Sequence, residues 1–143
     1  MKKLLLLFLV SMVFVSCNSG NNKPVIALKR ETVNKNPVKE YSEKIKDALN
    51  DDWYFKVQLF ETDSTFTYVV KTNYKAIEYE QRIRYPNLGY LPKPELKKGF
   101  YDKTVMVGFL DETGKFMDYK MVYVLDEEVG IRGVKRYTVN DKD

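Results

Sequence analysis

The sequence predicts an α+β fold in which one N-terminal amphipathic helix packs on a twisted antiparallel sheet of five or six strands. Between residues 36 and 52 apolar side chains recur every three or four positions, whereas from residue 53 onward they alternate with polar ones. These spacings are the periods of a helix and of half-buried strands. Because the only cysteine is Cys17, the domain over residues 38–143 must be held together by burial rather than by disulfides.

The predicted helix begins at Asn36 and ends before Asn50. Asn36 is a good N-cap, and Pro37 suits the first helical position because its missing N–H would have no partner there. Asp51 and Asp52 favour the end of the helix, since acidic side chains are unfavourable at its negative pole. One apolar stripe is predicted from Val38, Tyr41, Ile45, Ala48 and Leu49.

The first predicted strands alternate cleanly, so one face of each should be core and the other solvent. The expected core face carries Trp53, Phe55, Val57 and Leu59 in the first strand, Phe66, Tyr68 and Val70 in the second, and Ile77, Tyr79, Ile83 and Tyr85 in the third. On the solvent face of the third strand we expect Glu78, Glu80, Arg82 and Arg84.

The later strands are predicted to be more central. Residues 105–110 are apolar on both faces, with Gly108 leaving room for a close neighbour, and residues 111–114 form a good hairpin turn. The returning strand is predicted to place Met117, Tyr119, Met121, Tyr123 and Leu125 on one face. A loop over residues 126–130 then leads to a last strand over residues 131–139.

The leader of the chain is typical of a secretory signal, with two lysines before an apolar run from Leu4 to Val15. About 12 residues span about 18 Å as a helix, short of the ~30 Å hydrocarbon core, so a transmembrane anchor is the weaker interpretation. The stretch Phe14-Val15-Ser16-Cys17 resembles the lipobox of bacterial lipoproteins. That resemblance covers residues 1–17 and implies a diacylglyceryl group on the Cys17 sulfur and a further acyl chain on its amine.

The resemblance implies a signal peptide over residues 1–16 and a lipid on Cys17. The polar composition that follows predicts that 17–37 is the lipidated cysteine with a flexible tether, and the rest of the chain is predicted to be a single domain over 38–143. Asn18 after the cysteine implies the outer membrane, and the absence of a following acidic cluster favours its periplasmic face. The apolar run over residues 25–28 either belongs to the tether or forms a short edge strand.

Composition excludes several functions. The chain has 24 basic and 20 acidic residues, and removal of Lys2 and Lys3 with the leader leaves 22 basic ones, so the mature chain is nearly neutral. Nothing in that balance favours nucleic-acid binding. With no histidine, and with the one cysteine acylated, histidine bases, cysteine nucleophiles and the usual zinc sites are excluded, and we expect no cofactor.

The main candidate site is a long loop predicted over residues 85–101. It holds three of the five prolines together with aromatic and basic side chains. The residues expected to bind a partner are Tyr85, Tyr90, Lys93, Lys97, Lys98, Phe100 and Tyr101. Long ordered loops often bind partners, and Tyr beside Lys suits a protein or a glycan. The alternative is that these rings cover the open end of the sheet.

Other candidates have simpler explanations. Glu78 and Glu80 resemble a glycosidase pair, but the arginines that continue their row indicate a solvated face. Acidic residues 51–52 and 126–128 lack the spacing of a calcium loop. Three methionines at strand spacing (Met106, Met117 and Met121) fit core filling better than a metal site. The basic residues near the C-terminus are expected to be solvated, with anionic lipid headgroups as the alternative contact: Arg132, Lys135 and Arg136.

Together these features predict a non-catalytic, membrane-anchored periplasmic lipoprotein that binds an envelope protein or peptide, in one variant as an inhibitor or immunity-type protein. The alternative is a carrier or sensor of a small apolar ligand held between the helix and a curved sheet, which would need an enclosed aromatic cavity. The sequence does not indicate the oligomeric state.

Overall fold

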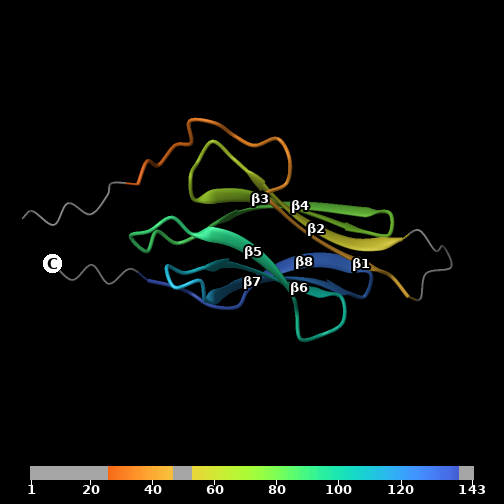
Figure 1. Ribbon diagram of the computed structural model, residues 1–143. Coiled ribbons are helices and arrows are strands. Elements are labelled where there is room, and N and C mark those ends of the chain that lie inside the picture. The colour runs from red at the N-terminus through yellow and green to blue at the C-terminus, as the bar shows by residue number, and fades with distance from the viewer. Residues whose placement is uncertain (1–25, 47–52, 139–143) are drawn as a thin grey trace, which may run out of the picture.

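The computed structural model describes residues 26–46 and 53–138, and in these ranges it is all-β, with eight strands and no helix. One antiparallel sheet contains β1 (Lys39–Lys44), β2 (Tyr54–Glu61), β3 (Thr67–Tyr74) and β4 (Ile77–Arg84). The other contains β5 (Lys93–Lys98), β6 (Thr104–Leu110), β7 (Phe116–Leu125) and β8 (Glu128–Gly133). The predicted α+β class with a single sheet is therefore wrong (Figure 1).

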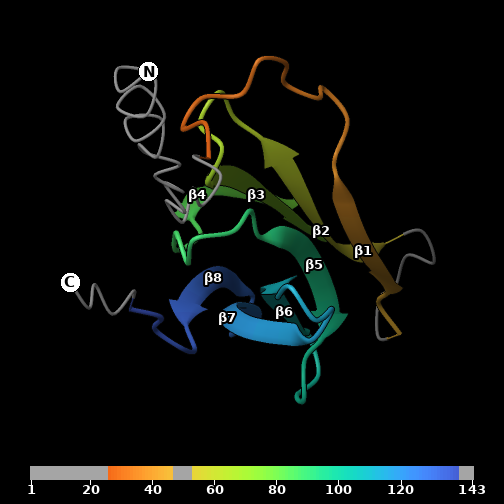
Figure 2. The same ribbon diagram turned by 60° about the vertical axis from the view of Figure 1, so that its left-hand side comes forward.

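The two sheets pack face to face, with β1 beside β5 and β4 beside β8 (Figure 2). Both sheets contribute to one core of buried side chains: Phe55, Val57, Leu59, Tyr68, Val70, Tyr74, Ile83, Tyr85, Val105, Val107, Phe109 and Val122. The buried Tyr85 hydroxyl, just after β4, donates a hydrogen bond of 2.8 Å to the Gly108 carbonyl of β6. This bond links the two sheets through the core.

The segment predicted as a helix is instead the edge strand β1. Its backbone pairs with β2 from Lys39 opposite Leu59 to Lys44 opposite Tyr54, and its side chains alternate between half-buried and exposed. The half-buried Lys39 and Glu43 form ion pairs of 2.9 Å and 2.7 Å with side chains of β5. Tertiary pairing thus overrides the helix propensity of a Lys- and Glu-rich segment. Ala48 and Leu49 of the predicted stripe lie outside the described residues.

The predicted strands after residue 53 are confirmed as β2, β3, β4, β6, β7 and β8, although β8 begins earlier than expected, at Glu128. Six of the seven residues of β6 are buried, as its apolar faces predicted. Gly108 is required by close packing, because a Cβ there would lie 2.3 Å from the Met117 carbonyl oxygen. The hairpin at residues 111–114 is confirmed, with Gly114 at a φ of 81°.

The predicted face of β7 is wrong because a β-bulge changes its phase. The register with β6 shifts between Val107 and Gly108. In β7, Met117 lies before the extra residue and packs on the core, as predicted. After the extra residue the core position is taken by Val122, while Met121 lies opposite Met106 on the other face of the sheet. One extra residue in a strand moves all later side chains to the other face.

The predicted loop over residues 85–101 is also corrected, because residues 93–98 form β5. This strand lies at the edge of its sheet and pairs only with β6. An edge strand accommodates Pro94, whose missing N–H would interrupt the pairing of a central strand. The prolines that suggest a loop are therefore compatible with a strand.

The described part of the N-terminal region, residues 26–37, lies against the domain. Residues 26–28, the described part of the apolar run, do not form an edge strand. The next residue, Lys29, forms only an isolated antiparallel bridge with Ser64. The leader and Cys17 lie outside the described residues, and within those residues no helix could span a membrane.

Candidate functional site

Three strand connections gather at one end of the sandwich, which we call the turn end: residues 75–76 between β3 and β4, residues 99–103 between β5 and β6, and residues 126–127 between β7 and β8. Lys75 and Glu127 join two of these turns through an ion pair of 2.6 Å. The Val124 N–H donates to the Lys103 carbonyl at 3.1 Å, which holds the third turn beside them. The turn end lies to the right in Figure 1.

The turn end carries all of the left-handed non-glycine backbone of the described residues. Positive φ angles occur at Lys75 (55°), Lys103 (52°), Asp126 (51°) and Glu127 (64°). At the opposite end the chain uses glycine for this conformation, at residues 89 and 114. A left-handed non-glycine residue costs about 1–2 kcal/mol. Such strain is concentrated at functional sites, which makes the turn end the candidate site.

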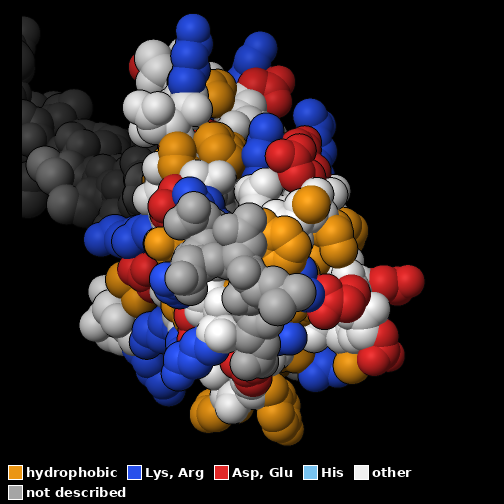
Figure 3. All heavy atoms as spheres, turned by 90° about the vertical axis from the view of Figure 1, so that its right-hand side faces the viewer, with side chains coloured by type: hydrophobic (Ala, Val, Ile, Leu, Met, Phe, Trp, Pro, Cys, Tyr) orange, Lys and Arg blue, Asp and Glu red, His pale blue; other side chains and the backbone are white. Residues whose placement is uncertain are grey.

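The turn end also exposes large apolar side chains. Phe100 is 95% exposed and Tyr101 is 69% exposed, both on the turn between β5 and β6, which lies lowest in Figure 1. Tyr54, Ile77 and Leu125 are further exposed apolar residues at this end. Figure 3 views this end, where hydrophobic, basic and acidic side chains intermix and hydrophobic ones form the lowest projection. Exposed aromatic rings of this kind mark surfaces for partner binding.

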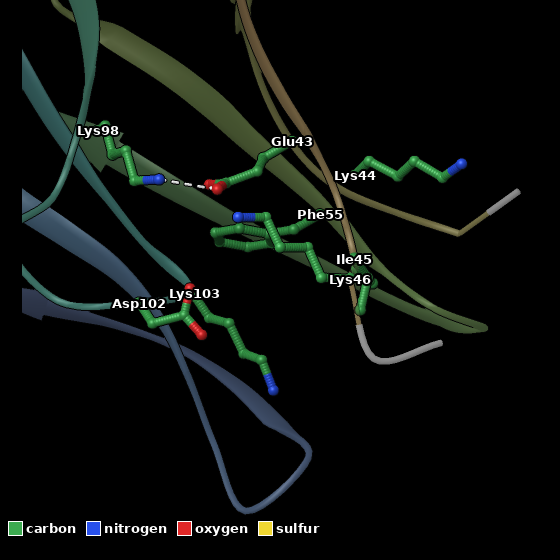
Figure 4. Close-up of a pocket in the computed structure, with 8 residues that line it drawn as sticks. All are labelled: Glu43, Lys44, Ile45, Lys46, Phe55, Lys98, Asp102 and Lys103. Atoms are coloured by element: carbon green, nitrogen blue, oxygen red, sulfur yellow. Dashed lines mark hydrogen bonds and ion pairs between the residues drawn. The ribbon is translucent and has the colours of Figure 1, made fainter. Parts of the chain in front are cut away.

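A hollow of about 190 Å³ opens beside this turn, between the ends of β1, β2 and β5 (Figure 4). Its wall is lined by Glu43, Lys44, Ile45, Lys46, Phe55, Lys98, Asp102 and Lys103. In Figure 4 the Lys98 amine and the Glu43 carboxylate point toward each other, whereas Lys44 extends away from them. The hollow thus presents mainly amines and carboxylates, with Ile45 and Phe55 beneath them, a mixture that suits a peptide better than an apolar ligand.

The Glu43 carboxylate of the hollow accepts hydrogen bonds from Lys98 and from Tyr41, which lies next to the hollow on β1. The hydrogen bond from Lys98, together with one from the Tyr41 hydroxyl at 2.7 Å, lowers the pKa of Glu43. Burial and that same bond to Glu43 raise the pKa of Tyr41 to about 12. Near neutral pH Glu43 is therefore a carboxylate and Tyr41 a neutral donor. Neither has the pKa near 7 that a general acid or base requires.

The structure separates the residues that the sequence predicts as one partner-binding loop. Lys98, Phe100 and Tyr101 lie at the turn end. The Tyr85 ring is in the core, and the Lys97 ammonium lies 4.4 Å from the centroid of the Phe116 ring. Tyr90 and Lys93 line a hollow at the opposite end, beside the hairpin turn of residues 111–114. Only the C-terminal part of the predicted loop therefore contributes to the candidate site.

Sequence reasoning missed Lys75 and Lys103, and it considered Asp126 and Glu127 only as calcium ligands. The signal that could have found these turns is a missing glycine. The connections at residues 75–76 and 126–127 contain none, although they turn sharply between paired strands. Such turns usually contain Asn-Gly or Asp-Gly. Glycine-free turns between strongly alternating segments would have indicated the strain.

The other candidates have structural roles. Glu80 forms an ion pair of 3.4 Å with Lys71 of β3, and the Glu78 carboxylate accepts a hydrogen bond of 3.4 Å from Asn73, as expected for a solvated sheet face. Among residues 26–46 and 53–138, no group of three or more metal-ligating side chains is present.

Comparisons of the chain with protein families, curated proteins and solved structures gave no match.

Proposed function

We propose that this protein is a non-catalytic, lipid-anchored protein of the bacterial cell envelope that binds an envelope protein or peptide through the turn end. The observation that carries the binding proposal is the exposure of Phe100 and Tyr101 on a turn surrounded by strained non-glycine backbone. A ring at such a position contributes contact area at low entropic cost when a partner buries it. An inhibitor or immunity-type role is one form of this function.

Membrane attachment is supported by the leader and by Cys17. Three acyl chains would hold the protein far more firmly than a single chain, because each buried methylene contributes about 0.8 kcal/mol. Asn18 favours the outer membrane, and the absence of an acidic cluster after it favours the periplasmic face. The chain also has no histidine, which supports a binding role rather than catalysis.

The anchor is tested by replacing its cysteine. Cys17→Ser should prevent acylation, so that the protein either leaves the membrane fraction or keeps its leader. The measurement is cell fractionation combined with the intact mass of the product. A variant that is still cleaved and still bound to membranes would refute the lipid anchor.

The binding surface is tested by capture of partners from detergent-solubilised envelopes. Phe100→Ala with Tyr101→Ala should weaken recovery of the partner by about tenfold or more, since loss of a central aromatic anchor costs more than about 1.4 kcal/mol. Leu91→Ala, at the opposite end, is the matched control because it also removes an exposed apolar side chain. Equal recovery by the double variant and wild type would exclude the turn end as the binding surface.

No observation favours the alternative of an apolar-ligand carrier. Such a carrier needs an enclosed apolar cavity. Between the sheets, Tyr74, Tyr85 and Phe109 are among the fully buried side chains that fill the interior.

A further inference from the structure

The N-terminal segment is fastened to the domain by one arginine. The Arg30 guanidinium donates hydrogen bonds to the carbonyl oxygens of Thr62 (2.7 Å), Ser64 (2.5 Å) and Thr65 (2.7 Å). Its carbon lies 4.6 Å from the centroid of the Tyr68 ring, and its side chain is only 11% exposed. We call this attachment of residues 27–30 to residues 62–67 the Arg30 clamp.

Backbone bonds complete the clamp. The Arg30 N–H donates to the Asp63 carbonyl at 2.8 Å, and the Thr65 N–H donates to the Leu28 carbonyl at 3.0 Å. The Thr65 hydroxyl adds a bond of 2.5 Å to the Ala27 carbonyl. Charge-assisted bonds from a nearly buried guanidinium are among the stronger ones in proteins. The chain is thus fixed to the domain from residue 27 onward.

The clamp lies at the end of the sandwich opposite the turn end. Residues 62–66 connect β2 to β3, and β3 then runs from Thr67 to the turn end at Tyr74. Eight residues of strand span about 26 Å. The site and the point of attachment are therefore separated by the length of the sandwich.

The chain between Cys17 and the clamp is short. Eight residues, 18–25, separate Cys17 from the first described residue. Even fully extended, they allow a reach of at most about 30 Å. A lipid on Cys17 would therefore keep the clamp end within about 30 Å of the bilayer. Because this reach is similar to the length of the sandwich, the orientation is set by which end has the surface that binds the bilayer.

The surface at the clamp end suits a bilayer surface. Leu28 (65%) and Val33 (44%) are large hydrophobic side chains left exposed beside the exposed Lys29 and Lys35. β8 runs toward the same end, and the residues that follow it are also exposed: Val134, Lys135 and Arg136. The exposed acidic residues at this end are fewer: Glu31 and Asp63 beside the clamp, and Glu112 in the hairpin turn between β6 and β7. Apolar side chains among basic ones bind bilayers that contain anionic lipid.

We propose that the clamp end rests on the bilayer that anchors the protein, so that the turn end faces away from it. The inference rests on the proposed lipid on Cys17. Its consequence is that the partner reaches the site from the aqueous side.

The orientation is tested with fluorophores on introduced thiols, which remain unique because acylation consumes Cys17. Val33→Cys labels the clamp end and Tyr101→Cys the turn end, with Leu125→Cys as a second label at the turn end. Each mature acylated variant is reconstituted in vesicles of phosphatidylglycerol and phosphatidylcholine that contain headgroup-spin-labelled lipid. Quenching should be about twofold or more stronger at position 33, because about one strand length separates the two ends. Lys29→Glu with Lys35→Glu should reduce this difference.

The outcomes separate the two proposals. Equal or reversed quenching in a sample whose mass shows acylated Cys17 would overturn the orientation alone. An unacylated Cys17 in that sample would refute the lipid anchor and the orientation with it. Denaturant midpoints equal to that of the wild type verify that each labelled variant is folded, and Leu125→Cys decides the result if Tyr101→Cys does not fold.

Discussion

At the scale of single residues, Arg30 has the largest predicted effect on stability. Arg30→Ala removes the donor that three partly buried carbonyl groups share. We expect a loss of about 2–3 kcal/mol in the free energy of unfolding, since bonds to charged groups contribute more than neutral ones. The measurement is urea denaturation of the domain.

Two variants give this prediction its controls. Lys29→Ala, at the neighbouring exposed position, should change the free energy of unfolding by less than about 0.5 kcal/mol. Arg30→Lys should recover only part of the loss, because an ammonium cannot reproduce the fork of the guanidinium. If Arg30→Ala were as stable as Lys29→Ala, the clamp would have no role in holding the N-terminal segment.

At the scale of elements, the strained backbone of the turn between β7 and β8 should lower the stability of the fold while it supports partner binding. Glu127 has a φ of 64°, a conformation that glycine adopts without strain. We expect Glu127→Gly to raise the free energy of unfolding by about 0.5–1 kcal/mol, since relief of strain is partly offset by the entropy of the unfolded chain. The exposed ion pair with Lys75 contributes little to stability. Urea denaturation measures this change.

Substitution by glycine one residue later should have the opposite effect on the free energy of unfolding. Glu128 begins β8 in an extended conformation, so Glu128→Gly should destabilise the protein by about 0.5–1 kcal/mol. If the strain serves binding, Glu127→Gly should also recover less partner despite its greater stability. Destabilisation by Glu127→Gly would show that this backbone conformation is not strained.

Most strands could be predicted from alternation, and the failures have definite physical causes. β2 and β3 present the expected faces because one buried row is enough to set their register. In β4 the expected core face is confirmed at Ile83, whereas Ile77 at the turn end is 38% exposed. β1 was not predictable, since the ion-pair partners of its inward Lys39 and Glu43 lie on β5, which is distant in sequence. The bulge in β7 leaves no mark in composition, so Met121 could not be assigned to the outer face.

At the scale of the whole molecule, the candidate site could be predicted only in part. Phe100 and Tyr101 are recognisable as aromatic residues in a connection. Lys75 and Glu127, also at the turn end, belong to two other turns. These turns meet because the two sheets, each with its strands in sequence order, stack with β4 beside β8. Sequence periodicity places residues on faces, but it does not reveal which sheet a strand joins or which turns meet at one end.

The ion pairs that join β1 to β5 should make the free energy of unfolding depend on pH. Hydrogen bonds from Lys98 and Tyr41 lower the pKa of Glu43. Burial raises the pKa of Glu95, but the bonds from Lys39 and the Leu96 N–H outweigh it and hold that pKa below its usual range. A carboxyl with a lowered pKa in the folded state stabilises the fold above its unfolded pKa of about 4.3, and this contribution is lost as the pH falls through the folded pKa.

We therefore expect the free energy of unfolding to fall below pH ~4.5, by about 1 kcal/mol for these two partly exposed pairs together. Urea denaturation between about pH 7 and pH 3 measures this dependence. Glu43→Gln with Glu95→Gln should flatten it, whereas Glu78→Gln with Glu80→Gln, on the solvated face of β4, should leave it nearly unchanged. A double variant at Glu43 and Glu95 with the same acid dependence as the wild type would mean that the Lys39 and Lys98 pairs do not hold β1 against β5, and that apolar burial alone closes this side of the sandwich.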